Sequence, residues 1–188
     1  MVCVGFGWAV LFLAPLYPHQ VFAFPSYQVG LLLLPMTAMP AIMPAVAGKL
    51  YDSRGVEICI ALIALLAVVS YALQLLSNDL SRLLFVLVLF GAAWGTGNGI
   101  GVPVALSNRR DGGNTGVVSD AAITVLNIGG VMSLSLIATV FHSVQIAQVD
   151  AHANKLHAFT EAYDVSIALL LVLSVVLLSL AAWFGRRV

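Results

Sequence analysis

Six apolar runs, each close to the length that crosses a lipid bilayer, constrain this sequence more than any other feature. Short segments rich in charged and turn-forming residues separate them. A bilayer core takes about 20 residues of helix at a rise of 1.5 Å per residue. We therefore expect an all-α membrane protein whose single domain, 1–188, contains six transmembrane helices at about 1–17, 28–48, 57–76, 83–106, 116–144 and 164–184.

Composition supports this fold class. The chain is 61% hydrophobic and only 9% charged, whereas a soluble domain carries about 25% charged residues. So few charges cannot cover the surface of a water-soluble globule, which excludes a soluble enzyme. The formal net charge is zero, so no basic excess predicts a nucleic-acid partner. The expected environment is the lipid bilayer.

The basic residues divide between the two sides of the predicted bundle. Arg82 and Lys155 fall on one side, and the other six follow the second, fourth and sixth runs: Lys49, Arg54, Arg109, Arg110, Arg186 and Arg187. Basic residues favour the cytoplasmic side. We expect a multi-pass protein of the cell (inner) membrane with both termini in the cytoplasm. No basic residue precedes the first run, which argues against a signal peptide.

Catalytic and metal-binding patterns are missing from the sequence. Cys3 and Cys59 lie far apart in apolar runs, and His152 and His157 are five residues apart with no cysteine nearby. A membrane-embedded enzyme would need clustered His, Asp, Ser or Cys at one depth. We predict no enzymatic activity, no cofactor and no bound metal.

The segment 48–55 carries the strongest local motif. Gly48, Asp52, Arg54 and Gly55 follow the pattern Gly, three residues, Asp, one residue, Arg, Gly. Glycines suit a tight turn between helices. Asp52 can cap the start of the next helix, and Arg54 can pair with Asp52 or with a helix C-terminus. The spacing fits equally an ordinary charged turn that keeps positive charge in the cytoplasm.

Small residues mark two predicted helices as sites of close packing. Gly91, Gly95 and Gly99 are four residues apart, and Gly129 and Gly130 are adjacent. Such residues let membrane helices approach closely. The spacing fits static packing, and it also fits a helix that slides or rocks. In the second helix, three prolines remove backbone donors and should bend it: Pro35, Pro40 and Pro44.

One polar stripe runs into the predicted bilayer. Asp120, Thr124 and Asn127 are spaced i, i+4 and i+7 on one helix face. It suits a substrate or proton path, because polar groups within lipid are costly. It also suits hydrogen bonding between helices, and Asp120 by itself suits a cap near a helix N-terminus. Asn98 and Gln74 are weaker candidates.

These motifs together resemble the major facilitator superfamily. The segment 48–55 is similar to its loop between the second and third helices, with Ser53 where the family has a basic residue. Three further stretches resemble the tenth, twelfth and thirteenth helices of fourteen-helix drug:proton antiporters of the EmrB/QacA type: 16–35, 95–103 and 116–141. The resemblance implies the C-terminal six-helix half of such a transporter.

Two functions are compatible with the sequence. The resemblance implies proton-coupled export of drugs or other small molecules, together with a missing N-terminal half or a second copy of this chain. Protons would then be the coupling ion. The alternative is a non-transporting fragment or assembly module of a membrane complex. Nothing in the motifs identifies a solute.

Overall fold

The structure is a computed structural model that describes residues 2–76, 79–107, 115–150 and 154–185. Its described residues form helices joined by short connections. The bounds are α1 Val2–Val21, α2 Ser26–Arg54, α3 Val56–Leu76, α4 Leu80–Ser107, α5 Thr115–Asp150 and α6 Lys155–Gly185. The expected all-α architecture is therefore correct.

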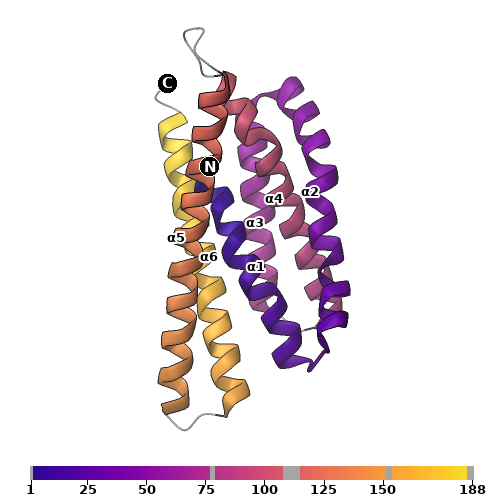
Figure 1. Ribbon diagram of the computed structural model, residues 1–188, viewed down its shortest axis with the longest axis vertical. Helices are drawn as coiled ribbons and strands as arrows, with labels where there is room; N and C mark the ends of the chain where they lie inside the picture. The colour runs from indigo at the N-terminus through magenta and orange to yellow at the C-terminus, as the bar shows by residue number, and fades with distance from the viewer. Residues whose placement is uncertain (1, 77–78, 108–114, 151–153, 186–188) are drawn as a thin grey trace.

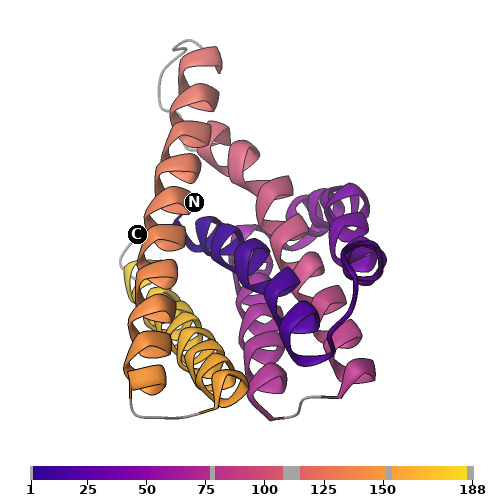
Figure 2. The same ribbon diagram turned by 60° about the horizontal axis from the view of Figure 1, so that its bottom comes forward.

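The helices form an elongated bundle with α1 between two groups. In Figures 1 and 2, α5 and α6 lie on one side of α1, and α2, α3 and α4 lie on the other. Successive helices run in alternating directions. Lys49 and Arg54 therefore lie at the end of the bundle where α2 meets α3, and Arg82 and Lys155 lie at the opposite end. The other basic residues fall outside the described ranges.

Within the residues that the structure describes, five helices, α2 to α6, are long and apolar enough to cross a membrane, rather than the six that the sequence predicts. The difference concerns the first run, 1–17, which corresponds to α1. α1 has 20 residues, about the minimum for a crossing, and contains Pro15 and Pro18. Large apolar side chains are exposed on the other helices, among them Leu31, Leu65, Ile128, Val131 and Val172.

The helices extend beyond the apolar runs. α2 continues to Arg54 instead of ending near Gly48, and α6 begins at Lys155 instead of residue 164. Hydropathy detects only the part of a helix that suits lipid. A helix satisfies its own backbone hydrogen bonds, so it can continue into polar sequence until a residue such as Gly55 interrupts it.

The packing of α4 against α2 is the most extensive contact between helices. A Cβ atom added at Gly95 would lie 2.8 Å from the Pro40 Cα, and one at Gly99 would lie 2.6 Å from the Pro44 Cα. At Gly91 the nearest atom is the carbonyl oxygen of Met36. Only hydrogen fits at these positions, so the glycines set how closely the helices approach.

The prolines of α2 explain why backbone atoms meet the glycines. Pro40 has no N–H group, so the carbonyl of Met36 loses its usual partner four residues later in the helix. This carbonyl is the one that faces Gly91. A carbonyl without an N–H partner can accept weak hydrogen bonds from the Cα–H groups of glycine across a close helix contact.

A second close contact joins α1 and α5. A Cβ atom at Gly130 of α5 would meet the Trp8 ring of α1 at 2.8 Å. The bundle can be divided into α1–α3 and α4–α6. The first helix of each group then packs against the second helix of the other, as α4 against α2 and α1 against α5.

α3 connects the bundle through side-chain hydrogen bonds. Ser70 donates its hydroxyl to the carbonyl of Val86 in α4 at 3.3 Å. Gln74 donates its side-chain N–H to the hydroxyl of Tyr163 in α6 at 2.6 Å. Hydrogen bonds between helices are stabilising where no water competes.

We expect Gly95→Ala to lower the free energy of unfolding by about 1–3 kcal/mol, because the new methyl group overpacks the contact with Pro40. The matched control is Gly30→Ala on α2, where the same methyl group meets no atom within 4 Å. Unfolding titrations of both variants in detergent micelles would measure the difference. Equal stability of the two variants would contradict this account of the α2–α4 contact.

Candidate functional site

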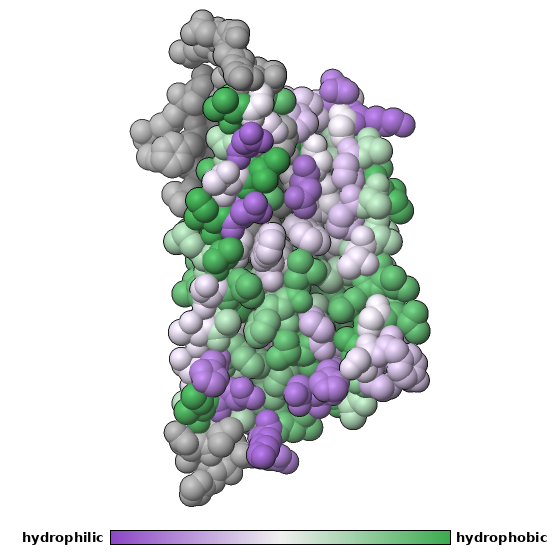
Figure 3. Space-filling view, in the orientation of Figure 1, coloured by the Kyte–Doolittle hydropathy of each residue, from purple (hydrophilic) through white to green (hydrophobic). Residues whose placement is uncertain are grey.

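The predicted polar stripe lies on the surface of the bundle. Asp120, Thr124 and Asn127 are all exposed on α5. Apolar side chains beside them, such as Val125 and Ile128, are exposed as well. Figure 3 shows hydrophilic residues gathered in the upper half of the face that carries α5, with a largely hydrophobic band below them. α5 therefore presents both polar and apolar surface to its surroundings.

The polar groups of this stripe, and of Asn98 on α4, are only partly satisfied within the part of the chain that the structure describes. Thr124 donates its hydroxyl to the backbone carbonyl of Asp120 at 2.7 Å. Asn98 of α4, also exposed, donates its amide to the carbonyl of Trp94 at 2.9 Å. Within the described ranges, no hydrogen bond or ion pair reaches the Asp120 carboxylate or the Asn127 amide. These two groups remain available to water, a solute or another polypeptide.

Asp120 lies in the second turn of α5, which begins at Thr115. The stabilising effect of a helix dipole on a carboxylate falls off within the first turn. The geometry therefore weakens the interpretation of Asp120 as a helix cap. Arg109 and Arg110, which precede α5 in the sequence and are candidate partners for the Asp120 carboxylate, lie outside the described residues, so the structure does not test such a pairing.

The segment 48–55 takes a form that the sequence did not predict. Instead of a loop, it forms the last two turns of α2, and Gly55 alone joins α2 to α3. Asp52 therefore lies at the C-terminal end of a helix, where its charge opposes the dipole, whereas the charge of Arg54 complements it. Asp52 and Arg54 are exposed, and no ion pair joins them in the described part of the chain.

The conformation of Gly55 explains the glycine at this position. Its φ of 82° and ψ of 176° fall in a region that only glycine adopts readily. Its N–H donates to the carbonyl of Tyr51 at 2.9 Å and closes the last turn of α2. Gly48, by contrast, lies within the helix, and a Cβ atom there would meet nothing within 4 Å.

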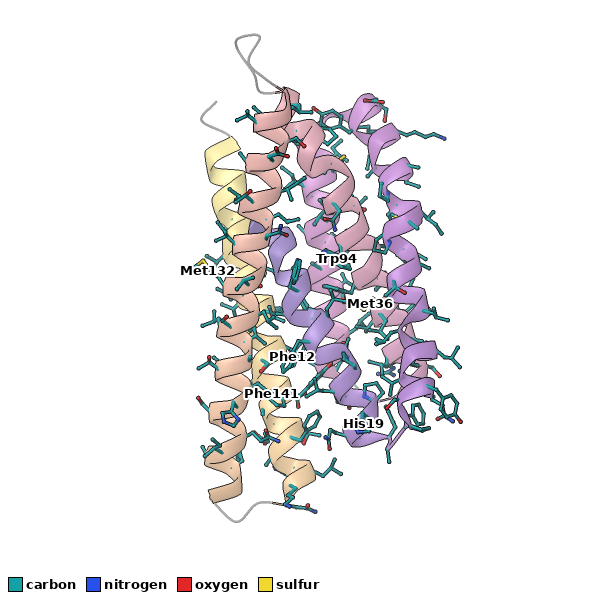
Figure 4. All side chains as sticks on the ribbon, in the orientation of Figure 1. Phe12, His19, Met36, Trp94, Met132 and Phe141 are labelled. Atoms are coloured by element: carbon teal, nitrogen blue, oxygen red, sulfur yellow. The ribbon has the colours of Figure 1, made fainter. Side chains whose placement is uncertain are left out.

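Two tryptophans pack between α1 and its neighbours, Trp94 half-buried and Trp8 partly exposed, and no motif in the sequence pointed to them. Trp94 of α4 packs against Gly7 of α1, where an added Cβ atom would lie 2.6 Å from the indole nitrogen. Trp8 of α1 packs against Gly130 of α5. In Figure 4, Trp94 and Met36 lie in the interior near mid-height, whereas Met132 of α5 points away from the bundle. Gly129 is buried beside Gly130.

Tyr17, Gln74 and Tyr163 form a buried polar cluster near the opposite end from the segment 48–55. The rings of Tyr17 and Tyr163 lie 4.6 Å apart, and Gln74 bonds to Tyr163. The sequence pointed only weakly to Gln74 and not to the tyrosines. A tyrosine in an apolar run gives no signal of its polar contacts, because partners come from distant helices.

The histidines do not assemble a metal site in the part of the chain that the structure describes. There, no group of three or more His, Cys, Asp or Glu side chains could hold an ion. His157 is exposed near the start of α6, and His152 lies outside the described ranges. Cys59 is buried and contacts the carbonyl of Ala47 at 3.9 Å.

Comparison with known proteins adds no relative. No protein-family model matches the chain, and no curated protein matches it either. The resemblance to drug:proton antiporters therefore rests on the motifs alone.

We expect Gly55→Ala to lower the free energy of unfolding by about 1–3 kcal/mol, because alanine is strained at this φ and ψ. Gly48→Ala is the matched control, since it adds the same methyl group in open space within a helix. Chemical unfolding of the purified protein would compare them. A Gly55→Ala variant as stable as Gly48→Ala would show that the α2–α3 junction adopts another conformation.

Proposed function

We propose that this chain is one six-helix half of a transporter that exports drugs or other small molecules in exchange for protons. The observation that carries the proposal is the set of exposed polar side chains Asp120, Thr124 and Asn127 on α5 and Asn98 on α4, on helices that also expose large apolar side chains. In this proposal the face forms one wall of a water-filled path across the membrane.

The argument for a path is energetic. On insertion scales an ionised side chain costs about 2.5–3.5 kcal/mol at the centre of a membrane helix and less toward the helix ends, and Asp120 lies in the second turn of α5. Polar side chains in membrane helices therefore face a protein neighbour or a water-filled cavity. The described residues supply no partner for Asp120 or Asn127. A path lined by water satisfies both groups and lets Asp120 exchange a proton.

The helix arrangement supports the same proposal. The packing of α4 against α2 corresponds to that of α1 against α5 when α1–α3 are exchanged with α4–α6. Because each group has three helices, two such groups in one membrane run in opposite directions. Inverted repeats of this kind occur in many transporters, where sites lie at the repeat interfaces.

The full proposal places the protein in the cell (inner) membrane. α1 would supply a sixth span, both termini would lie in the cytoplasm, and the end with Lys49 and Arg54 would face inward. The second wall of the path would come from an N-terminal half or from a second copy of the chain. The segment 48–55 would then contact that second half at the cytoplasmic end.

We expect a cysteine at position 127 to react with a membrane-impermeant thiol reagent at least tenfold faster than one at position 128. Asn127→Cys places the thiol on the polar face, whereas Ile128→Cys is an equally small change at an exposed apolar position. Both are made with Cys3→Ser and Cys59→Ala, in vesicles of native membrane. Equally slow labelling at the two positions would contradict a path filled with water.

The role of Asp120 can be measured separately. In proteoliposomes with an imposed pH gradient, we expect Asp120→Asn to abolish proton-coupled flux of ethidium while leaving membrane insertion intact, since the amide cannot exchange a proton. Glu57→Gln, an exposed carboxylate in the first turn of α3, is the matched control. Normal flux in Asp120→Asn would leave Asp120 as a structural residue. Absence of flux in the unmodified protein would favour a non-transporting assembly module.

A further inference from the structure

α5 carries a second polar triplet that the proposed path does not include. Its members are exposed and are spaced i, i+4 and i+7: Ser135, Thr139 and His142. The stripe that begins at Asp120 has the same spacing, about four helical turns earlier. The two sets point in directions that differ by only about 60° around the helix axis. We call the earlier set, 120–127, the inner triplet and the later set, 135–142, the outer triplet.

An apolar band separates the two triplets. Ile128, Val131 and Met132 are exposed there, at 54%, 56% and 68%. The one polar side chain in the stretch 128–134, that of Ser133, is buried. Figure 4 shows Met132 near mid-height of α5, pointing away from the bundle. The polar surface of α5 is therefore interrupted over about 12 Å of helix.

The spacing of these three parts matches the thickness of a bilayer. The part of α5 that is long and apolar enough to cross a membrane is Gly116–Gln148. Asp120 and His142 are about 33 Å apart along the helix, close to the roughly 30 Å of a hydrocarbon core. Val131 lies midway between them. In a bilayer the triplets occupy opposite halves of the membrane, and the apolar band lies at its centre.

The outer triplet needs a polar environment for the same reason as the inner triplet. Thr139 donates its hydroxyl to the backbone carbonyl of Ser135 at 2.8 Å. Among the described residues, no hydrogen bond or ion pair reaches the Ser135 hydroxyl or the His142 ring. Polar side chains of membrane helices face a protein neighbour or a water-filled cavity. Water on this side of Val131 satisfies the outer triplet as water on the other side satisfies the inner one.

We propose that the exposed face of α5 contains two polar sections of the path, one open to each side of the membrane, with a dry barrier of Ile128, Val131 and Met132 between them. This inference rests on the proposed function and adds the outer triplet and the barrier to it. Water leaves a narrow passage that is lined by apolar side chains, so protons and ions do not cross it. The barrier thus preserves the proton gradient while no solute is carried.

Labelling from each side of the membrane tests the two sections. Asn127→Cys and Ser135→Cys place a thiol about one turn to either side of Val131, and both are made with Cys3→Ser and Cys59→Ala. A membrane-impermeant maleimide reaches the outer side in spheroplasts and the cytoplasmic side in inverted vesicles. With no solute added, we expect Asn127→Cys to react at least tenfold faster in inverted vesicles, and Ser135→Cys at least tenfold faster in spheroplasts.

A thiol at an apolar position on another helix is the control. Val172→Cys on α6, where valine is 54% exposed, should react slowly from both sides. Fast labelling of Asn127→Cys and Ser135→Cys from the same side would overturn the barrier. Slow labelling of Ser135→Cys from both sides would overturn the outer section.

The barrier itself is tested by making it polar. In proteoliposomes with an imposed pH gradient and no ethidium, we expect Val131→Asn to collapse the gradient at least fivefold faster than the unmodified protein. Val172→Asn adds the same amide at an equally exposed valine and should change nothing. Val131→Thr, which is nearly isosteric, serves where the amide impairs membrane insertion. An unchanged rate of collapse in an inserted Val131 variant would overturn the barrier.

The proposed function is measured separately, as ethidium flux in the unmodified protein. Normal flux with both thiols labelled from one side would contradict the barrier and leave the transporter intact. Labelling of the two thiols from opposite sides without flux would support the two polar sections and contradict the proposed transport.

Discussion

The close approach of α2 and α4 is the contact on which the rest of the bundle depends. It requires glycines at positions 91, 95 and 99 of α4, which meet atoms of Met36, Pro40 and Pro44 in α2. In lipid, apolar side chains gain little from leaving their surroundings, so helices associate through close van der Waals packing and weak backbone contacts. The α2–α4 pair provides both, and α3 joins it through Ser70.

α1 is held in the bundle by a different kind of contact from the one that joins α2 and α4. Its closest packing places large rings on small residues, with Trp8 over Gly130 and Trp94 over Gly7. Two prolines interrupt its backbone hydrogen bonding near the Tyr17 end. A helix that is held by ring contacts, and whose backbone hydrogen bonding is interrupted near one end, can change its position at a lower cost in free energy than a helix held by close contacts between backbones. The Tyr17 end of α1 thus belongs to the part of the bundle that is held least by contacts between backbones.

Much of the fold could be predicted because membrane helices can be recognised in a sequence by their length and hydropathy. The positions of the helices along the chain follow from length and hydropathy. The close packing at Gly95 and the place of Asn127 on the polar stripe follow from helical spacing. The ends of the helices could not be predicted. α2 continues from Lys49 to Arg54 because a helix satisfies its own backbone hydrogen bonds. It ends where Gly55 adopts a positive φ. Hydropathy contains no information about that angle.

The sequence by itself determined the all-α fold class, the approximate positions of the helices and the polar spacing of α5, because each depends on residues close together in the chain. Tertiary structure alone decided which helix meets which glycine, and that Tyr17, Gln74 and Tyr163 share one buried cluster. These residues come from three helices, and Gln74 and Tyr163 are 89 positions apart. Hydrogen bonds depend on distances in space, which local spacing cannot specify.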